Sequence, residues 1–307
     1  AGTPRVAFML DALEELREAY RERGSELLVR RGDPAAVVPK TAVEYDAEIV
    51  SWNRDYSGLA RERDGRVREA LDTTDTTPQQ FHDAICHEPG SITTNAGDPY
   101  SVYTYFWKKW RDREKDDPRS VPTLAETPRG DEPVPSLSAL GFDEPDADVP
   151  AAGPDAARRL LDSFLESEVY RYEEARDYPA EECTSRLSPH LKFGTIGIRE
   201  VDARVRELLD ETAGERRESV ESFQSQLAWR EFYTHVLYFN PEVVAANYKT
   251  YPNPIEWEND ETLLEAWKRG ETGYPIVDAG MRQLREEAFM HNRVRMIVAS
   301  FLTKDLL

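Results

Sequence analysis

Two short segments of the chain carry side chains whose types and spacing suit the binding of an anion or a nucleobase. In the first, Thr184, Ser185 and Ser188 lie where a helix is expected to begin, and Arg186 stands between them. Hydroxyls and backbone N–H groups at a helix start bind anions, and a guanidinium adds a bidentate donor for phosphate. The competing interpretation is ordinary capping of the helix by Ser or Thr, which this segment alone favours.

The second segment, QLAWREFY, places four polar or aromatic side chains on one face of an expected helix. Gln226, Trp229, Arg230 and Tyr233 follow each other at i, i+3, i+4 and i+7. An amide, an indole, a guanidinium and a phenol in one stripe can stack on a base and hold a phosphate. The competing interpretation is a core helix whose Trp and Tyr are buried.

A third group lies near the end of the chain, where Asn292, Arg295 and Met296 share one helical face. Between Arg282 and Lys304 there are five cations and two acids, although the chain is acidic overall. This local positive patch indicates either pairing with acids elsewhere or an anionic ligand. His291 alone is expected to form a structural hydrogen bond.

The elements that must position these side chains alternate between helices and strands in the first part of the chain and are helices in the later part. Apolar spacing predicts a helix over 8–22 and another over 34–43, with strands at 26–29 and 47–52. This alternation indicates a parallel sheet with crossover helices. The strand that should precede the first helix is absent and there is no initiator Met, so we expect the chain to begin inside an α/β unit.

The second half of the chain has a different character. Residues 116–155 are rich in Pro, Asp, Glu and Ser, which is typical of a linker. Helical periodicity follows, and it runs to the last residue without a capping signal, so we expect truncation there too. The predicted helices are 157–175, 198–210, 215–239, 261–269, 275–290 and 292 to the end.

Composition excludes several classes of protein. The 307 residues contain 39 Lys+Arg and 59 Asp+Glu, a formal charge of −20, and only 8 of the cations are Lys. Such a surface suits concentrated salt and predicts a halophilic source. No signal peptide, long apolar run or phosphate loop is present, two cysteines are too few for a disulfide or zinc scaffold, and five scattered histidines form no metal motif. We expect a soluble, cytoplasmic, monomeric protein without a membrane partner.

Taken together, the motifs resemble those of the DNA photolyase/cryptochrome family, and most closely class I cyclobutane pyrimidine dimer photolyases of haloarchaea. The matching stretches are HEPGSI (87–92), YSVYTYFWKKW (100–110), TSRLSPHL (184–191), WREFY (229–233) and GYPIVDAGMRQL with MHNRVRM (273–296). The resemblance implies an α/β antenna domain over 1–97 with an incomplete, Rossmann-like parallel sheet. A connector over 98–156 and an all-α FAD-binding domain over 157–307, incomplete at its C-terminus, would follow.

The resemblance also implies roles for individual residues. Flavin contacts would come from Tyr172, Thr184, Ser185, Arg186, Leu187, Ser188, Phe223, Phe289, Asn292 and Arg295. DNA would be faced by Arg176, Gln226, Trp229, Arg230, Tyr233, Asn292 and Arg293. The lesion pocket would be lined by Trp229, Gln226, Asn292 and Met296, and Trp257 would be the surface end of a tryptophan electron-transfer chain whose other members lie beyond Leu307.

The implied activity is light-dependent repair of dimers in UV-damaged DNA by an electron from excited, reduced FAD. Gln226 instead resembles the (6-4) photolyase and animal cryptochrome branch, whereas Asn292 and Met296 favour dimer repair. The alternatives are a cryptochrome photoreceptor without repair activity, a (6-4) photolyase, or a helical binding module without cofactor. WNRDYSGLARERD (52–64) lacks the Asn-Glu pair of folate-binding members, which favours a deazaflavin antenna, or none, over a folate. We expect weak FAD retention by these residues alone.

Overall fold

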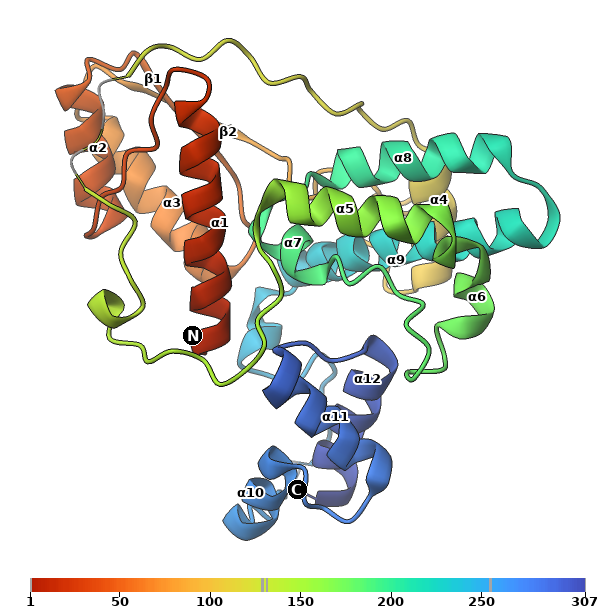
Figure 1. The fold of residues 1–307 in the computed structure, drawn as a ribbon. Coiled ribbons are helices and arrows are strands. Elements are labelled where there is room, and N and C mark those ends of the chain that lie inside the picture. Colours follow the sequence, from red (N-terminus) through yellow and green to blue (C-terminus); the bar gives the residue numbers. More distant parts are fainter. Residues whose placement is uncertain (1, 128–129, 131, 254–255, 307) are drawn as a thin grey trace. The chain divides into compact units, whose positions relative to one another are not determined.

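The protein is described by a computed structural model that covers residues 2–127, 130, 132–253 and 256–306 (Figure 1). The predicted linker and the last predicted helix include a few residues outside this description. The chain forms two compact units, and each is assembled from separate stretches of sequence. Unit one comprises Ala1–Leu27, Leu124–Thr195 and Tyr251–Leu307, and unit two comprises Leu28–Thr123 and Ile196–Thr250.

Unit two begins with a small α/β substructure. Strands β1 (Ile49–Asn53) and β2 (Thr77–Phe81) pair in parallel, with Ile49 opposite Thr77, and helix α3 (Gly58–Leu71) connects them. A parallel pair requires such a crossover. Helix α2 (Pro34–Glu44) packs on α3, and Val50 and Trp52 of β1 pack against the cluster that these helices bury. The buried members of the cluster are Ala42, Val67 and Leu71. The prediction of a parallel sheet with crossover helices is therefore confirmed.

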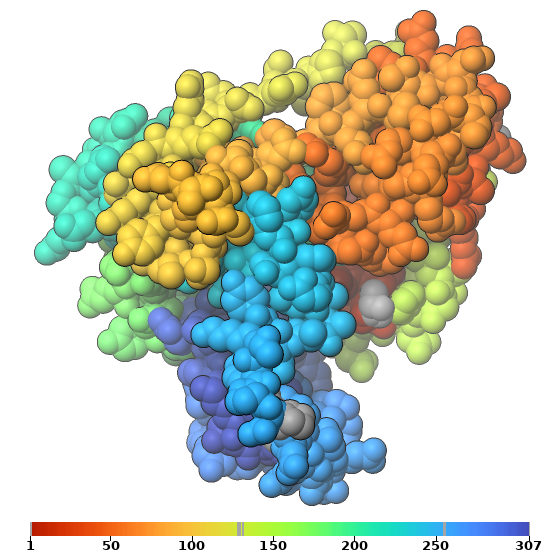
Figure 2. All heavy atoms as spheres, turned by 180° about the vertical axis from the view of Figure 1, so that it is seen from behind, coloured from red at the N-terminus to blue at the C-terminus, as the bar shows by residue number. Residues whose placement is uncertain are grey.

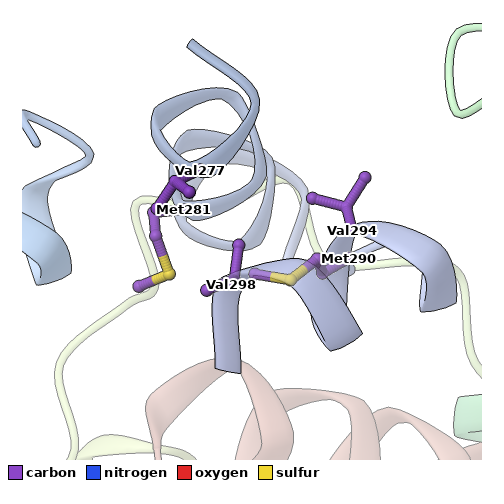
Figure 3. Close-up of a cluster of buried hydrophobic side chains, with 5 residues drawn as sticks. All are labelled: Val277, Met281, Met290, Val294 and Val298. Carbon is purple, nitrogen blue, oxygen red and sulfur yellow. The ribbon is translucent and has the colours of Figure 1, made fainter. Parts of the chain in front are cut away.

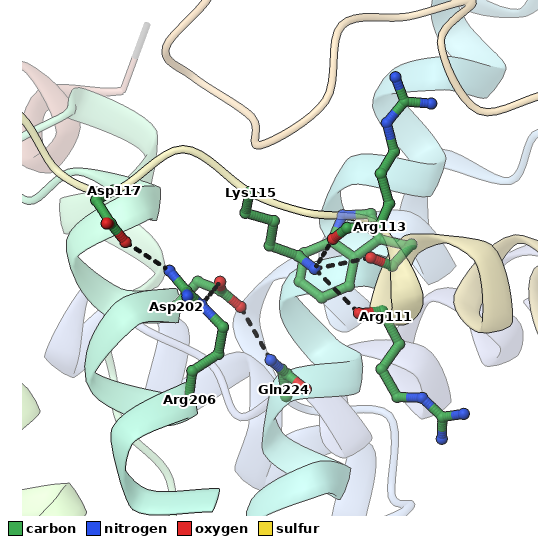
Figure 4. A network of polar contacts seen from close by, with 8 residues as sticks. Arg111, Arg113, Lys115, Asp117, Asp202, Arg206 and Gln224 are labelled. Atoms are coloured by element: carbon green, nitrogen blue, oxygen red, sulfur yellow. Dashed lines mark hydrogen bonds and ion pairs between the residues drawn. The ribbon is translucent and has the colours of Figure 1, made fainter. Parts of the chain in front are cut away.

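The rest of unit two is helical, with α4 (Tyr103–Asp112), α8 (Ile198–Glu211), α9 (Gly214–Phe239) and η3 (Pro241–Val244). Polar contacts connect α8 with α9 and with the segment after α4 (Figure 4). The Asp202 carboxylate on α8 accepts from Gln224 of α9 at 3.0 Å and from Arg206 at 2.9 Å, and Arg206 also pairs with Asp117 at 3.2 Å. Lys115 donates to three carbonyls at the end of α4, which are the groups that a helix C-terminus leaves without intrahelical partners.

Unit one contains helices from both ends of the chain. It consists of α1 (Thr3–Arg21), η1 (Ser138–Leu140), α5 (Gly153–Glu166), η2 (Glu168–Arg171), α6 (Tyr172–Ala175), α7 (Ser188–Phe193), α10 (Glu261–Arg269), α11 (Pro275–Glu287), α12 (Asn292–Phe301) and η4 (Leu302–Leu306). Helix α1 packs on α5, and its Phe8 ring contacts His190 and Phe193 of α7 at centroid distances of 5.2 and 5.3 Å. The N-terminal helix is thus part of the same core as α5 and α7.

Helices α11 and α12 form a closely packed pair (Figure 3). Side chains of the two helices and of Met290, which lies between them in the chain, form one buried apolar cluster; its other members are Val277, Met281, Val294 and Val298. Gly280 lies at the closest approach, because a Cβ atom there would meet Cγ1 of Val294 at 2.2 Å and Cγ2 of Val298 at 3.0 Å. Glycine at this position therefore lets the two helices come together.

Several predicted boundaries differ from the structure: the first helix begins at Thr3 and not at residue 8, the helix predicted over 275–290 ends at Glu287, and the last α-helix ends at Phe301. Two further predictions are wrong in kind. Residues 26–29 form no strand: Leu27 N–H bonds to the carboxylate of Glu26, which Arg17 and Arg21 hold at 2.9 and 3.0 Å, so the backbone has no ladder partner. The predicted helix 157–175 is interrupted after Glu166, because Ser167 leaves helical geometry with φ −141° and the chain continues as η2. The polar strand β2 and helices α3 and α4 were not predicted.

Candidate functional site

The predicted site residues are distributed over both units, and each unit is considered by itself. Unit two contains the members that lie on α9, which are Phe223, Gln226, Trp229, Arg230 and Tyr233. Unit one contains the remaining predicted site residues, which lie in the segments 172–188 and 257–296.

Helix α9 has one buried face and one partly exposed face. Its buried positions repeat at helical spacing and are Ser219, Val220, Phe223, Gln224, Leu227, Ala228, Glu231, Phe232 and His235. Gln226, Trp229 and Arg230 are only half-buried, and Tyr233 is 62 % exposed. The predicted stripe therefore lies on the solvent side of the helix, and its interpretation as core is wrong. Phe223, predicted to contact flavin, packs inside the unit.

Trp229 lies at the centre of an aromatic stack. The ring of Tyr103, the first residue of α4, is parallel to it at 9° with a centroid distance of 3.6 Å. Tyr233 stacks on Trp229 at 5.5 Å, and Phe232 meets it edge-on at 5.6 Å. Figure 2 shows α4 in yellow beside the later part of α9 in cyan. The sequence spacing did not reveal the role of Tyr103, since its partner is far away in the chain.

The residues next to Trp229 fix α9 to the segment before α4. Arg230 donates to the carbonyl of Ala84 at 2.5 Å, and the Glu231 carboxylate accepts from the backbone N–H groups of Cys86 and His87 at 2.7 and 2.9 Å. Burial raises the pKa of Glu231 to about 7, against the lowering effect of these hydrogen bonds. The helix that carries the stripe is thereby held by buried polar contacts as well as by apolar packing.

In unit one, Arg186 and Phe289 are brought together although 103 positions separate them in the numbering. The Arg186 guanidinium lies 4.4 Å from the centre of the Phe289 ring and pairs with Glu287 at 2.7 Å. Both Arg186 and Ala288 have a positive φ of 51°, which non-glycine residues seldom adopt. Arg186, Glu287 and Phe289 line one cavity of about 560 Å³; its other lining residues are Asp148, Val149, Pro150, Ala151, Ala156, Arg159, Leu160 and Glu182.

The segment of hydroxyl residues does precede a helix, as predicted. Helix α7 begins at Ser188, but the capping residue is Leu187 and no side chain caps the helix, so the capping interpretation is wrong. Thr184 and Ser185 are half-buried and Ser188 is exposed, whereas Leu187 is buried. Three hydroxyl residues therefore neighbour Arg186 in the sequence without serving the helix as caps.

Tyr172 and Arg176 lie close together on and after the short helix α6. Tyr172 is buried, with its ring edge-on to Phe164 at 5.9 Å, and the Arg176 guanidinium is 5.8 Å from its centroid. Burial raises the pKa of Tyr172 to about 12, although Arg176 acts in the opposite direction. Arg176 also pairs with Glu173 at 3.5 Å.

Helix α12 presents its predicted face to solvent. His291 caps the helix by accepting from the Arg293 N–H at 3.2 Å, which confirms its structural role. Asn292, Arg295 and Met296 are exposed, and the Asn292 amide lies 3.9 Å from the Met296 sulfur. Arg293 donates to Asp177, and this hydrogen bond lowers the pKa of that carboxyl. The predicted electron-transfer residue, Trp257, is 43 % exposed.

These groups fit part of a flavin nucleotide. The Arg186 guanidinium, held over the Phe289 ring at a cavity, offers a donor for a diphosphate and a surface for a planar ring, and the same cavity is lined by the carboxyl groups of Asp148, Glu182 and Glu287. The exposed stack on α9 offers a second aromatic surface, suited to a base. Unit one thus carries groups for an anionic cofactor, and unit two carries groups for a stacked ligand.

Comparison with known families identifies the family of the chain. Residues 1–128 match the family described as DNA photolyase, and residues 223–307 match the FAD binding domain of DNA photolyase. The chain therefore belongs to the DNA photolyase/cryptochrome family.

Among individual proteins, the chain is 63% identical over 314 residues to the deoxyribodipyrimidine photo-lyase of Halobacterium salinarum, an alignment covering 100% of this chain and 65% of that protein. A crystal structure of a class III photolyase from Agrobacterium tumefaciens superposes with TM-score 0.88 at 34% identity, covering 100% of this chain and 64% of that one. An archaeal photolyase from Sulfolobus tokodaii, solved with two FAD molecules, gives TM-score 0.79 at 31% identity, covering 98% and 64%.

These likenesses confirm the predicted fold class, an α/β N-terminal part with a helical FAD-binding part, and the expected relationship to haloarchaeal photolyases. The chain spans about 65% of the length of the Halobacterium relative. Within the part of the chain that the structure describes, no helix combines the length and the apolar character that crossing a membrane requires.

Proposed function

We propose that this chain supplies flavin-binding and DNA-facing parts of a photolyase that splits cyclobutane pyrimidine dimers in UV-damaged DNA with light. The observation that carries the proposal is the half-exposed stack of Tyr103, Trp229 and Tyr233 beside Gln226 and Arg230. The name of the 63% identical relative, deoxyribodipyrimidine photo-lyase, supports the same activity.

The stack suits a lesion that has left the double helix. Photolyases act on a target extruded from the base stack, and damage lowers the cost of extrusion because the damaged bases pair and stack poorly. An aromatic surface then compensates for lost stacking, by about 1–3 kcal/mol per base. Trp229 would stack on the dimer, and the Gln226 amide, one turn earlier on α9, would donate to or accept from it.

FAD would be held by the residues predicted from the family resemblance, of which Arg186 and Phe289 line the cavity in unit one. When bound and reduced, FAD supplies the electron that opens the dimer in light. The role of the protein is to bind and to orient. Arg186, kept over the Phe289 ring by Glu287, would face the diphosphate, and the hydroxyls of Thr184, Ser185 and Ser188 would donate to it.

Contact with DNA requires cations in a chain of charge −20. Arg293 is paired with Asp177 and Arg176 with Glu173, so a phosphate would have to replace a carboxylate at each. Both pairs are partly exposed and therefore weak, so the exchange costs little. This arrangement keeps both cations neutralised until a more highly charged partner arrives.

The second candidate function is that of a photoreceptor of the cryptochrome type. Asn292 and Met296, exposed together on α12, favour dimer repair over this alternative and over the (6-4) branch. We also propose a deazaflavin, rather than a folate, as any antenna pigment; the second FAD of the Sulfolobus tokodaii structure belongs to that protein. The domain boundaries at 97 and 156, the monomeric state and the cytoplasmic location remain predictions.

A repair assay tests the proposal directly. The chain loaded with FAD, chemically reduced, is mixed with UV-irradiated oligothymidylate, and dimers are counted after blue light and after darkness. We expect dimers to disappear only in the light. Flavin-loaded protein that leaves the dimer count unchanged would favour the photoreceptor, whereas protein that takes up no flavin would contradict both light-driven functions.

A further inference from the structure

Tyr103 makes two contacts with the same turn of α9. Its ring lies parallel to the Trp229 indole at 3.6 Å, and its hydroxyl donates to the backbone carbonyl of Ser225 at 2.6 Å. Ser225 precedes Trp229 by four residues, so its carbonyl is the one that accepts the backbone N–H of Trp229 in an α-helix. One contact fixes the ring of Tyr103 against the helix backbone, and the other fixes the indole against that ring.

The surroundings of Trp229 leave it little rotational freedom on this side. Phe232 contacts both rings edge-on, at 5.6 Å from Trp229 and 5.8 Å from Tyr103. Phe232 is buried, as is Phe106, one turn after Tyr103 on α4. The partner of the indole is therefore anchored in the core of unit two, while the indole itself is half-exposed. A stacked pair of this kind is worth about 0.5–1.5 kcal/mol beyond its buried area.

We propose that Tyr103 is a positioning residue for damage recognition: it holds the indole plane of Trp229 in the orientation in which an extruded pyrimidine dimer stacks on it. This inference rests on the proposed function, in which Trp229 meets the dimer. Tyr103 and Tyr233 both stack on Trp229, so a base has to use the indole surface that neither ring covers or replace the ring of Tyr233, which is 62 % exposed. Fixing the indole in advance removes the rotamer entropy that the side chain would otherwise lose on binding.

The opposite role predicts the opposite sign. If Tyr103 occupied the place that the dimer takes, it would compete with the lesion, and its removal would strengthen binding. If Tyr103 positions Trp229, its removal weakens binding. The hydroxyl bond to the α9 backbone favours positioning, because a competitor would have to break that bond each time the lesion enters.

The test measures binding in the dark, so it does not depend on catalysis. The FAD-loaded chain is titrated into fluorescent single-stranded oligonucleotides with and without one thymine dimer. Tyr103→Leu is expected to weaken binding to the dimer oligonucleotide about three- to tenfold, the range of one aromatic stack, and to leave binding to the undamaged one unchanged. Tyr103→Phe, which keeps the ring and loses only the bond to Ser225, is expected to lose about twofold. Tyr105→Leu is the matched control, since Tyr105 lies on the same helix and is 59 % exposed.

A double-mutant cycle separates positioning from general stability. In a Trp229→Leu background, Tyr103→Leu should have no further effect on dimer binding, because there is no indole left to orient. An effect of the same size in both backgrounds, or tighter dimer binding by Tyr103→Leu, would overturn the proposal. If Tyr103→Leu does not fold, Tyr103→Phe decides, and an unchanged dimer affinity rejects it. A natural chain without preference for dimer DNA would instead reject the proposed function, and the role of Tyr103 with it.

Discussion

The guanidinium of Arg186 lies 4.4 Å from the centre of the Phe289 ring, and Glu287, two residues before that ring, holds it there at 2.7 Å. Arg186 reaches this position from a backbone with φ 51°, a conformation that costs roughly 1 kcal/mol or more for a non-glycine residue. The surrounding contacts offset this cost. A strained cation fixed over an aromatic ring at a cavity indicates a binding site that is formed before its ligand arrives.

Arg186→Ala should therefore weaken FAD binding by about 10- to 150-fold, which corresponds to the loss of one hydrogen bond between charged groups, about 1.5–3 kcal/mol, to the diphosphate. Flavin fluorescence during titration of the flavin-free chain measures this directly. Arg269→Ala is the control, because Arg269 forms a similar ion pair with Glu271 on the surface of the same unit. Equal FAD affinities of the two variants would show that Arg186 has only a structural role.

The sequence predicted the long helices well because their apolar spacing is a local property. Helix α10 was predicted with its observed bounds, and α9 to within one residue at its start. The half-exposed stripe on α9 followed from the same spacing. The spacing does not determine whether the Trp229 side chain is buried or exposed, because its burial depends on which distant residues pack against it.

Contacts between distant segments were beyond the reach of local patterns. Tyr103 was expected only as part of a connector, and its stacking on Trp229 joins residues on two helices of unit two. The pairing of Arg186 with Glu287 likewise involves segments far apart in the sequence. Strand β2, TPQQF, has few apolar residues and is held by its ladder with β1, so its own residues gave little signal.

Gly280 provides a test of the packing of α11 against α12. Gly280→Ala puts a methyl group about 2.2 Å from Val294, so the helices must move apart, and we expect a loss of about 1–3 kcal/mol in the free energy of unfolding. Gly65→Ala is the matched control: it also lies inside a helix, α3, and nothing lies within 4 Å of its added methyl. That variant should gain up to about 1 kcal/mol from helix propensity. Urea unfolding of both variants checks the prediction, and a neutral Gly280→Ala would contradict the tight helix contact.

Glu231 should make the stability of unit two depend on pH. Its pKa in the folded chain is raised to about 7 by burial, whereas an unfolded glutamate titrates near 4.5. Between these two pH values the folded state keeps a proton that the unfolded state has released. The unfolded state is therefore favoured more as pH rises, and the free energy of unfolding falls until pH reaches about 7. Below about 4.5 and well above 7 its contribution no longer changes with pH.

The histidines near Glu231 act in the other direction. Burial lowers the pKa of His87 to about 3 and also lowers the pKa of His235, so both favour the folded state as pH rises through their unfolded pKa. The contribution of Glu231 must therefore be read from a difference between variants. Glu231→Gln removes the charge and keeps one oxygen acceptor for the backbone N–H groups of residues 86 and 87.

We expect the natural chain to lose stability relative to Glu231→Gln between pH 5 and pH 8, by about 2–3 kcal/mol, because about two units of the pKa shift fall within this window. Urea unfolding at both pH values in high salt measures the difference, since salt screens a buried carboxylate poorly. Glu265→Gln is the control: Glu265 is exposed, and its hydrogen bond with Lys268 lowers its pKa, so it titrates below this window. A constant difference in the free energy of unfolding between the natural chain and Glu231→Gln from pH 5 to pH 8 would contradict this prediction. Glu231 would then be ionised throughout, and the hydrogen bonds that it accepts from two backbone N–H groups would outweigh the cost of burying its charge.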